Sequence, residues 1–224
     1  MTSIDLLNVP KNTKKKIIGV YKYSSCNVNS LVNALEMISV NYKLSSNFSD
    51  ISDCYKIILP GVGNMKNISK ENMSYMSKEV KNYILEGGFI YGICLGCQLL
   101  FESSDEAGRE TLGVFKGKVE DISNNYKLKL NIGYKNLNFE DDNWQEKKIL
   151  KYFKGVDLNT KFYFLHRFFC NYDDEKIHNL KINVNNKKMP VLFFKGNVLG
   201  TQFHPELSKK SGLNFLKNVS EMPL

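Results

Sequence analysis

Short apolar runs alternate with amphipathic stretches along the first hundred residues. The apolar runs have the length of buried strands, and one of them ends in a Pro-Gly turn. The stretches between them have the apolar spacing of helices, and the second of these closes on glycine. This order predicts a parallel sheet with helices on its faces. The predicted strands are residues 15–23, 55–63 and 88–93, and the predicted helices are residues 29–39 and 78–88.

The second half of the chain has a different pattern, because from about residue 111 the apolar stretches shorten to strand-like pieces. We expect these pieces to add strands to the same core. The predicted fold class is therefore α/β, with a mostly parallel central sheet and helices on both faces. The pieces are residues 112–122, 127–134, 162–169, 181–185 and 189–203.

Length and composition fit a single soluble domain. A chain of 224 residues that is 42% hydrophobic and 24% charged is typical of a globular protein, and no apolar run has the roughly 18 residues of a membrane span. Residues 1–16 lack the apolar core of a signal peptide, and their lysines follow the hydrophobic positions. We expect a flexible extension over residues 1–16, one domain over residues 17–224, and a cytoplasmic protein.

Charge and cysteine content exclude little by themselves. The net charge of +8 permits nucleic-acid binding, but the lysines are scattered among asparagines and form no stripe, so we expect no nucleic-acid partner. The five cysteines are an odd number without paired spacing, which favours reduced thiols. Cys94 and Cys97 form a C-x-x-C pair, but no second pair or histidine cluster accompanies it, so we expect neither metal nor cofactor.

Cys94 lies between Gly92 and Gly96, after an apolar strand and before an apolar helix. The pattern matches the strand-turn-helix elbow in which a strained nucleophile needs neighbours without side chains. A helix N-terminus there stabilises a thiolate and leaves N–H groups for an oxyanion. The alternative is a small buried hydrophobic cysteine.

A nucleophilic cysteine needs a base, and the chain has three histidines, His166, His178 and His204. His204 is followed by Pro205 and Glu206. Because the proline fixes the local backbone, the carboxylate can orient the imidazole and stabilise its charged form. Cys94, His204 and Glu206 together form a candidate triad, although an isolated His-Pro-Glu is more often a surface turn.

Three segments in this order resemble the class I (triad) glutamine amidotransferases: LPGVGNM (59–65), GICLGCQLLFESSDE (92–106) and GTQFHPELS (200–208). Within that class the likeness is greatest to the glutaminase subunits of imidazole glycerol phosphate synthase, and it runs from about residue 17 to the C-terminus. The resemblance implies a glutaminase that hydrolyses glutamine to glutamate without a cofactor. It also implies a heterodimer in which ammonia passes to a (β/α)8-barrel synthase of histidine biosynthesis.

The resemblance implies three kinds of site residue. The triad would form and hydrolyse a thioester, backbone N–H groups would bind its oxyanion, and further residues would contact glutamine. Taken alone, the glycine turn could be an ordinary loop, the glutamine a solvated helix residue and the first histidine a buried structural residue. The implied residues are catalytic Cys94, His204 and Glu206, oxyanion-binding Gly63 and Leu95, and substrate-binding Gly61, Gln98 and His166.

Several positions depart from the family pattern while the triad remains intact. We expect these departures on the face that meets the synthase. They leave open a paralogue that supplies ammonia to a sugar amidotransferase in bacterial surface-glycan biosynthesis, and, as a third alternative, a non-catalytic binding relative. The positions are Ser24, Cys26, Asn131, Tyr134, Arg167 and Leu207.

Overall fold

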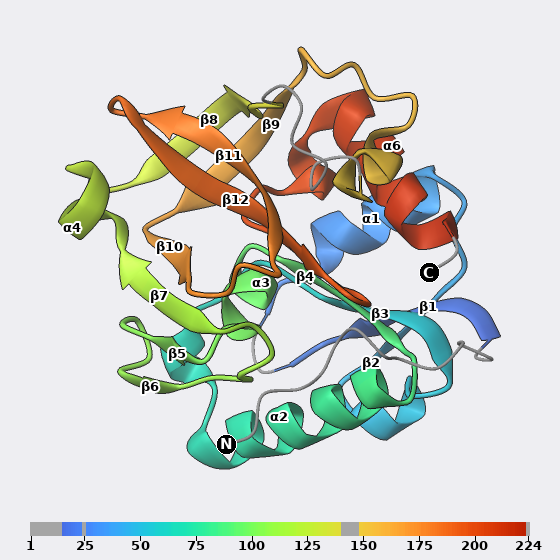
Figure 1. The fold of residues 1–224 in the computed structure, drawn as a ribbon. Helices are drawn as coiled ribbons and strands as arrows, with labels where there is room; N and C mark the ends of the chain where they lie inside the picture. The colour runs from blue at the N-terminus through green and yellow to red at the C-terminus, as the bar shows by residue number, and fades with distance from the viewer. Residues whose placement is uncertain (1–14, 24–25, 140–147, 223–224) are drawn as a thin grey trace.

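A seven-stranded sheet forms the centre of the computed structural model, which describes residues 15–23, 26–139 and 148–222 (Figure 1). Five neighbouring strands run parallel, and two antiparallel strands complete one edge. In spatial order the strands are β11 (His178–Val184), β12 (Lys187–Lys195), β13 (Val198–Thr201), β4 (Phe89–Ile93), β3 (Cys54–Leu59), β1 (Lys15–Tyr21) and β2 (Tyr42–Ser45).

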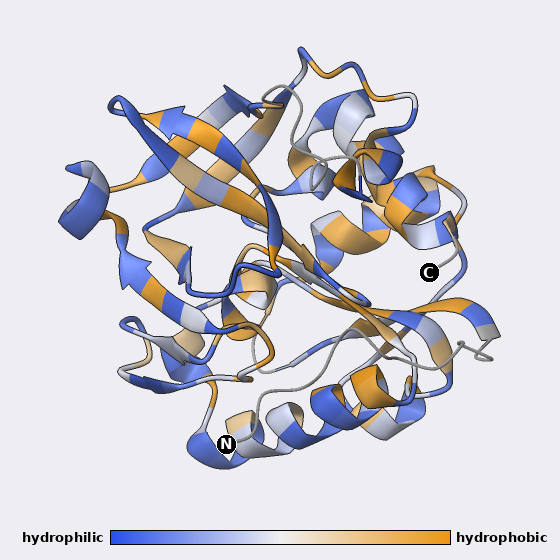
Figure 2. Cartoon of the chain, in the orientation of Figure 1, coloured by the Kyte–Doolittle hydropathy of each residue, from blue (hydrophilic) through white to orange (hydrophobic). Residues whose placement is uncertain are grey.

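Helices cover both faces of this sheet. In Figure 1, α2 (Lys70–Leu85) lies below it, and α1 (Asn29–Met37) and α6 (Lys209–Glu221) lie above it. The hydropathy of these elements agrees with this packing. In Figure 2 each of these helices has hydrophobic and hydrophilic stretches, whereas the central strands are largely hydrophobic. The predicted α/β class, with its mostly parallel sheet, is confirmed.

The second half contributes strands to three sheets. Three of its strands join the central sheet, and two more form the pair β8-β9. The remaining two, β7 and β10, form a four-stranded sheet with β5 and β6, which precede residue 111, in the order β10-β7-β5-β6. Buried side chains from all three sheets belong to one hydrophobic core, as expected. The additional elements are β5 (Ser103–Ser104), β6 (Arg109–Glu110), β7 (Gly117–Asp121), α4 (Ile122–Tyr126), β8 (Asn131–Asn136), β9 (Lys161–His166), β10 (Phe168–Tyr172), α3 (Leu95–Leu99), and the short 3-10 helices η1 (Phe48–Asp50), η2 (Met65–Asn67), η3 (Lys151–Phe153) and η4 (Pro205–Leu207).

The helix predicted at 78–88 begins earlier, because the side chain of Ser69 caps the first turn of α2 by accepting a hydrogen bond from the Asn72 N–H. Met73 and Met76 extend its buried face towards the N-terminus. The helix ends before Gly87, which has a left-handed φ of 85°. The pattern therefore located the helix but missed its first two turns.

The lysine side chain of Lys56 is buried in the core. Lys56 on β3 is 2% exposed, and its Nζ donates hydrogen bonds to the carbonyl oxygens of Val219 and Met222 at the end of α6. Burial, together with the charge of Lys151, lowers the pKa of Lys56 to about 7. Its ammonium lies over the ring of Phe89.

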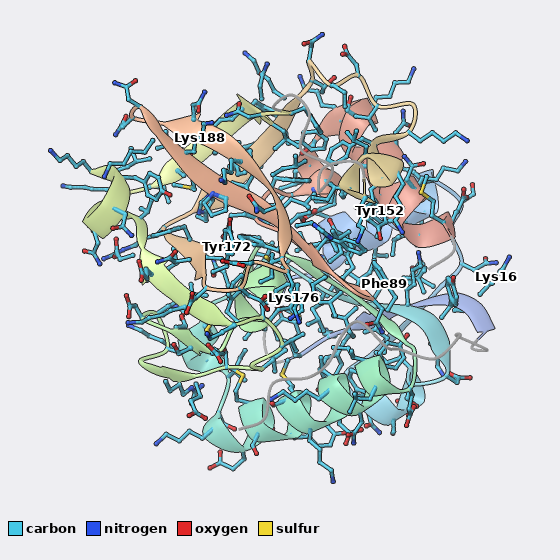
Figure 3. All side chains as sticks on the ribbon, in the orientation of Figure 1. Lys16, Phe89, Tyr152, Tyr172, Lys176 and Lys188 are labelled. Atoms are coloured by element: carbon cyan, nitrogen blue, oxygen red, sulfur yellow. The ribbon has the colours of Figure 1, made fainter. Side chains whose placement is uncertain are left out.

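The labelled side chains of Figure 3 illustrate the contrast between core and surface. Phe89 and Tyr152 lie among packed side chains, with ring centroids 6.4 Å apart, whereas Lys16 projects from the periphery. No helix within the described ranges is long and apolar enough to cross a membrane. Most of the extension expected over residues 1–16 lies outside the described residues; residues 15 and 16 begin β1.

Candidate active site

The candidate site is a cavity of about 460 Å³ beside the carboxyl end of β4. Ligands of open α/β sheets bind at this end of the strands. Cys94 follows β4 directly, and His204 comes shortly after β13, the strand next to β4. Apart from Glu206, which contacts His204, every residue predicted for the site lines the cavity: Gly61, Gly63, Cys94, Leu95, Gln98, His166 and His204.

Cys94 has the backbone of a strained elbow, with φ 45° and ψ −101°. Its N–H donates a hydrogen bond to the Thr201 carbonyl oxygen, 2.6 Å away, and α3 begins at the next residue. A non-glycine residue in such a conformation costs on the order of 1–3 kcal/mol and persists only where the surrounding fold holds it. The fold thus exposes the thiol to the cavity at some cost in stability.

The two glycines beside Cys94 are required by close packing. A Cβ on Gly92 would lie 2.5 Å from the carbonyl oxygen of Gly96, and a Cβ on Gly96 would overlap the carbonyl oxygen of Leu59. Neither glycine has a positive φ. Backbone thus passes backbone at the elbow, with no room for a side chain.

His204 and Glu206 form a buried pair, with 2.7 Å between Nδ1 and Oε1. Since a carboxylate only accepts, Nδ1 carries the hydrogen and Nε2 is left for Cys94. Burial by itself lowers the pKa of His204, but the charges and hydrogen bonds of Cys94 and Glu206 outweigh burial and raise this pKa well above its ordinary value. The arrangement suits an imidazole that gains and returns a proton beside sulfur.

The other two histidines are engaged elsewhere. Nδ1 of His166 donates to the Phe168 carbonyl oxygen and its Nε2 accepts from Nδ2 of Asn131, each at 2.7 Å. Burial lowers the pKa of His166 to about 4, so its ring is neutral. His178 lies on β11, stacked against Phe194. His204 is therefore the histidine that the structure brings to Cys94, while His166 forms a neutral wall of the cavity.

The glycine turn predicted to supply the oxyanion hole lies against the elbow. The Leu95 N–H donates a 3.4 Å hydrogen bond to the Gly61 carbonyl oxygen, and the Val62 carbonyl oxygen accepts from the Asn27 N–H at 3.0 Å. The hydroxyl of Tyr23 donates to the Pro60 carbonyl oxygen. The Leu95 N–H, one of the two predicted oxyanion donors, is thus hydrogen-bonded to the turn itself.

Gln98 lines the cavity, but its amide nitrogen is already committed. Nε2 donates to the Phe168 carbonyl oxygen at 3.0 Å and to Oε1 of Gln202 at 3.2 Å. Gln202 is fully buried, and its own Nε2 lies 3.4 Å from Sγ of Cys94. Gln202 is not among the site residues predicted from the sequence. Its position two residues before His204 was the available signal, since alternate residues of an extended chain point the same way.

The site offers no grouping for a metal ion. Among the residues that the structure describes, no three His, Cys, Asp or Glu side chains gather closely enough to hold one. The five cysteines all lie in the described ranges and form no disulfide with one another. The groups available for chemistry are a thiol, an imidazole, a carboxylate and backbone N–H donors.

This geometry is that of a cysteine-dependent amide hydrolase, and a comparison with known families narrows the class. The family model "Glutamine amidotransferase class-I" matches residues 20–220. The chain belongs to the class I glutamine amidotransferases, enzymes that hydrolyse glutamine with a Cys-His-Glu triad.

Several known proteins are similar to this chain over nearly its whole length. "Imidazole glycerol phosphate synthase subunit HisH" of Caldanaerobacter subterraneus subsp. tengcongensis is 33% identical over 208 residues, covering 92% of this chain and 98% of the relative. The subunit of that name from Methanocaldococcus jannaschii is 33% identical over 210 residues, covering 92% and 100%. The solved structure of PurLQS from Thermotoga maritima shares the fold, with a TM-score of 0.64 and 20% identity over 91% of this chain and 96% of that one.

Proposed function

We propose that this chain is the glutaminase subunit of an imidazole glycerol phosphate synthase of histidine biosynthesis. It would act in the cytoplasm and deliver ammonia to a (β/α)8-barrel synthase subunit. The observation that carries the proposal is the likeness to HisH subunits, which extends over 98% and 100% of the two relatives.

The chemistry follows from the contacts of the proposed triad. His204 takes the proton of the Cys94 thiol, the sulfur attacks the side-chain amide carbon of glutamine, and His204 passes that proton to the nitrogen that leaves as ammonia. His204 then takes a proton from water, whose oxygen attacks the γ-glutamyl thioester and releases glutamate and the thiol. Glu206, 2.7 Å from Nδ1, keeps Nε2 of His204 turned towards these atoms. The N–H groups of Leu95 and Gly63 would bind the oxyanion once the turn rearranges.

An apolar rim around the cavity supports the proposed partner. Six large hydrophobic side chains there are each more than a third exposed. Four line the cavity, and the other two adjoin them, since Ile132 pairs with Leu165 across β8 and β9 and the Tyr134 hydroxyl donates to the Leu207 carbonyl oxygen. Ammonia crossing to a synthase must avoid water, where it becomes a non-nucleophilic ammonium ion. The rim comprises Val62, Leu130, Ile132, Tyr134, Leu165 and Leu207.

Three of the departures from the family pattern also lie at or beside this rim. Cys26 and Asn131 are buried, so the expectation of one partner-facing surface is wrong for these two, and Ser24 lies outside the described residues. Tyr134 and Leu207 belong to the rim, and Arg167 lines the cavity while pairing with Asp121 at 2.8 Å. A changed partner would alter these positions and leave the triad intact. A paralogue that serves a sugar amidotransferase is therefore the second candidate.

The test measures glutamate release by the chain mixed with either partner. We expect stimulation by a histidine-pathway barrel with its nucleotide ligand. Ile132→Asp should abolish that stimulation, because Ile132 is 56% exposed on the rim. Leu85→Asp, on a leucine 51% exposed at the end of α2, is the matched control and should leave it unchanged. Stimulation only by a sugar amidotransferase would overturn the proposal in favour of the paralogue.

A further inference from the structure

The side chain of Gln202 lies against the sulfur of Cys94. Nε2 of the amide is 3.4 Å from Sγ, and Gln202 is fully buried. Within the described part of the chain, this sulfur also has a hydrogen bond with His204 and a 3.8 Å approach to the Leu165 carbonyl oxygen. The sulfur therefore meets an amide donor in addition to the imidazole.

The orientation of this amide is determined by its neighbours. The Phe168 carbonyl oxygen can only accept, so the nitrogen of Gln98 must face it at 3.0 Å. The second hydrogen of that nitrogen points to Gln202, 3.2 Å away, which must present its oxygen. The Cys170 thiol approaches the same oxygen at 3.9 Å. The nitrogen of Gln202 is consequently turned towards Cys94, and a flipped amide would break this series of hydrogen bonds.

We propose that Gln202 is a catalytic residue that stabilises the thiolate of Cys94, and that Gln98 is the positioning residue that holds it. The inference rests on the proposed role of Cys94 as nucleophile. An amide N–H donates and cannot accept, so its hydrogen bond to sulfur strengthens when the thiol loses its proton. Because Gln202 is buried, water does not compete for its amide hydrogen. Gln98 thereby acquires a role besides the contact with glutamine expected from the sequence.

Several other ionisable groups lie near Cys94, and their effects on its thiolate can be distinguished from that of Gln202. Tyr23 and Cys170 interact with its charge, but burial raises the pKa of both well above the ordinary values, so they stay neutral. His204 is the charged neighbour that bonds the sulfur. Charged side chains from other elements that line the cavity are Lys66, Glu106 and Arg167. A substitution at Gln202 keeps His204 and these three charged side chains, and of the contacts of these ionisable groups it removes only that of the neutral Cys170 thiol with Oε1.

The test is the pH dependence of Cys94 alkylation by iodoacetamide, measured on the full chain by mass spectrometry of the Cys94 peptide. Alkylation follows the thiolate and needs no glutaminase activity, so it separates this proposal from the proposed function. In Gln202→Met, which keeps the side-chain length but loses the donor, we expect the midpoint to rise by about one pH unit, a tenfold loss of thiolate at fixed acidic pH. Gln202→Glu should raise it further, since a carboxylate repels the thiolate.

Asn197→Leu is the matched control. Asn197 is another buried amide, but its Nδ2 donates to the carbonyl oxygens of Ile84 and Gly88, away from the sulfur. This variant should lose stability and keep the midpoint of the unsubstituted chain. If Gln202 has only a structural role, its variants should likewise lose stability and keep the alkylation midpoint.

Gln98→Met provides a second measurement and keeps the test decisive if the Gln202 variants do not fold. It leaves the amide of Gln202 in place but frees it to rotate, so we expect a smaller upward shift. The acidic limb of the glutaminase pH profile should move with the alkylation midpoint in each variant. An unchanged midpoint in the folded Gln202 variants, or in Gln98→Met if neither folds, overturns the proposal.

Discussion

The N–H of Leu95 donates a 3.4 Å hydrogen bond to the carbonyl oxygen of Gly61. This donor is one of two that the resemblance assigns to the oxyanion hole, so it must leave Gly61 before it can stabilise a tetrahedral intermediate. A Cβ on Gly61 would lie 2.6 Å from the Ile93 carbonyl oxygen, which shows how closely the turn packs on the elbow. Rearrangement of this turn is thus the expected barrier to activity in the isolated chain.

We therefore predict slow glutamine hydrolysis by the chain alone and faster hydrolysis with the synthase partner and its ligand. Tyr23→Phe removes a hydrogen bond that holds the turn at Pro60. A hydrogen bond of about 1 kcal/mol corresponds to about a fivefold rise in the partner-free rate. Tyr42→Phe, which removes the exposed bond to Glu36, is the control. Equal rates for Tyr23→Phe and the unsubstituted chain would show that the hydrogen bond from Tyr23 to Pro60 does not limit activity.

Cys94→Ala should abolish glutaminase activity, because no other thiol lines the cavity among the residues described there. Cys97→Ala should remain active, since Cys97 packs behind the elbow against Gly200. The measurement is glutamate release under saturating glutamine with the partner present. Activity in Cys94→Ala comparable to the unsubstituted chain would remove Cys94 from the mechanism.

Strain at the elbow gives a stability prediction that is independent of activity. Glycine adopts the φ of 45° seen at Cys94 more readily than alanine does. Cys94→Gly should therefore unfold with a free energy about 1 kcal/mol higher than that of Cys94→Ala. Urea unfolding of the two variants provides the comparison. A glycine variant less stable than the alanine variant would argue that the fold tolerates this backbone without strain.

Loss of the imidazole should be more damaging than loss of its orienting carboxylate. His204→Asn should lose about 10³-fold or more in kcat, and Glu206→Gln should lose less, because an amide still contacts Nδ1 but does not stabilise the charged ring. Since Cys94 and Glu206 raise the pKa of His204, Glu206→Gln should also lower the pH at which this imidazole titrates. Wild-type activity in Glu206→Gln at neutral pH would make Glu206 a turn residue only.

The buried Lys56 predicts a pH dependence of stability in the opposite sense to that of a lysine in a salt bridge. Its pKa is lowered from 10.5 to about 7 in the folded chain, so between these values the unfolded chain binds more protons. The free energy of unfolding should consequently rise with pH over this window, by at most about 1.4 kcal/mol per unit. Urea unfolding at pH 7, 8 and 9 measures the rise. Lys56→Met should abolish this contribution, and Lys16→Met on the surface should preserve it.

Much of the fold was predictable because it follows from local periodicity. The strand that precedes Cys94 and the helix beginning at Asn29 have patterns set by neighbouring residues. The first turns of α2 were missed because their start depends on a single serine cap, Ser69. Local patterns could not divide the later strands among three sheets, since pairing brings together residues far apart in the chain.

The candidate site likewise has features that follow from local spacing and features that only the tertiary structure determines. Two features follow from spacings of two residues: the glycines on either side of Cys94, and the pair formed by His204 and Glu206. The sequence alone therefore located the elbow at Cys94 and the imidazole of the candidate triad. Only the tertiary structure decided that His166 is neutral, because burial and two hydrogen bonds from other segments determine its state. It also decided that the amide of Gln202 faces the sulfur of Cys94, 108 positions away in the chain. Such a contact depends on how β4 and β13 pair, and pairing over that separation is settled by burial of the whole core.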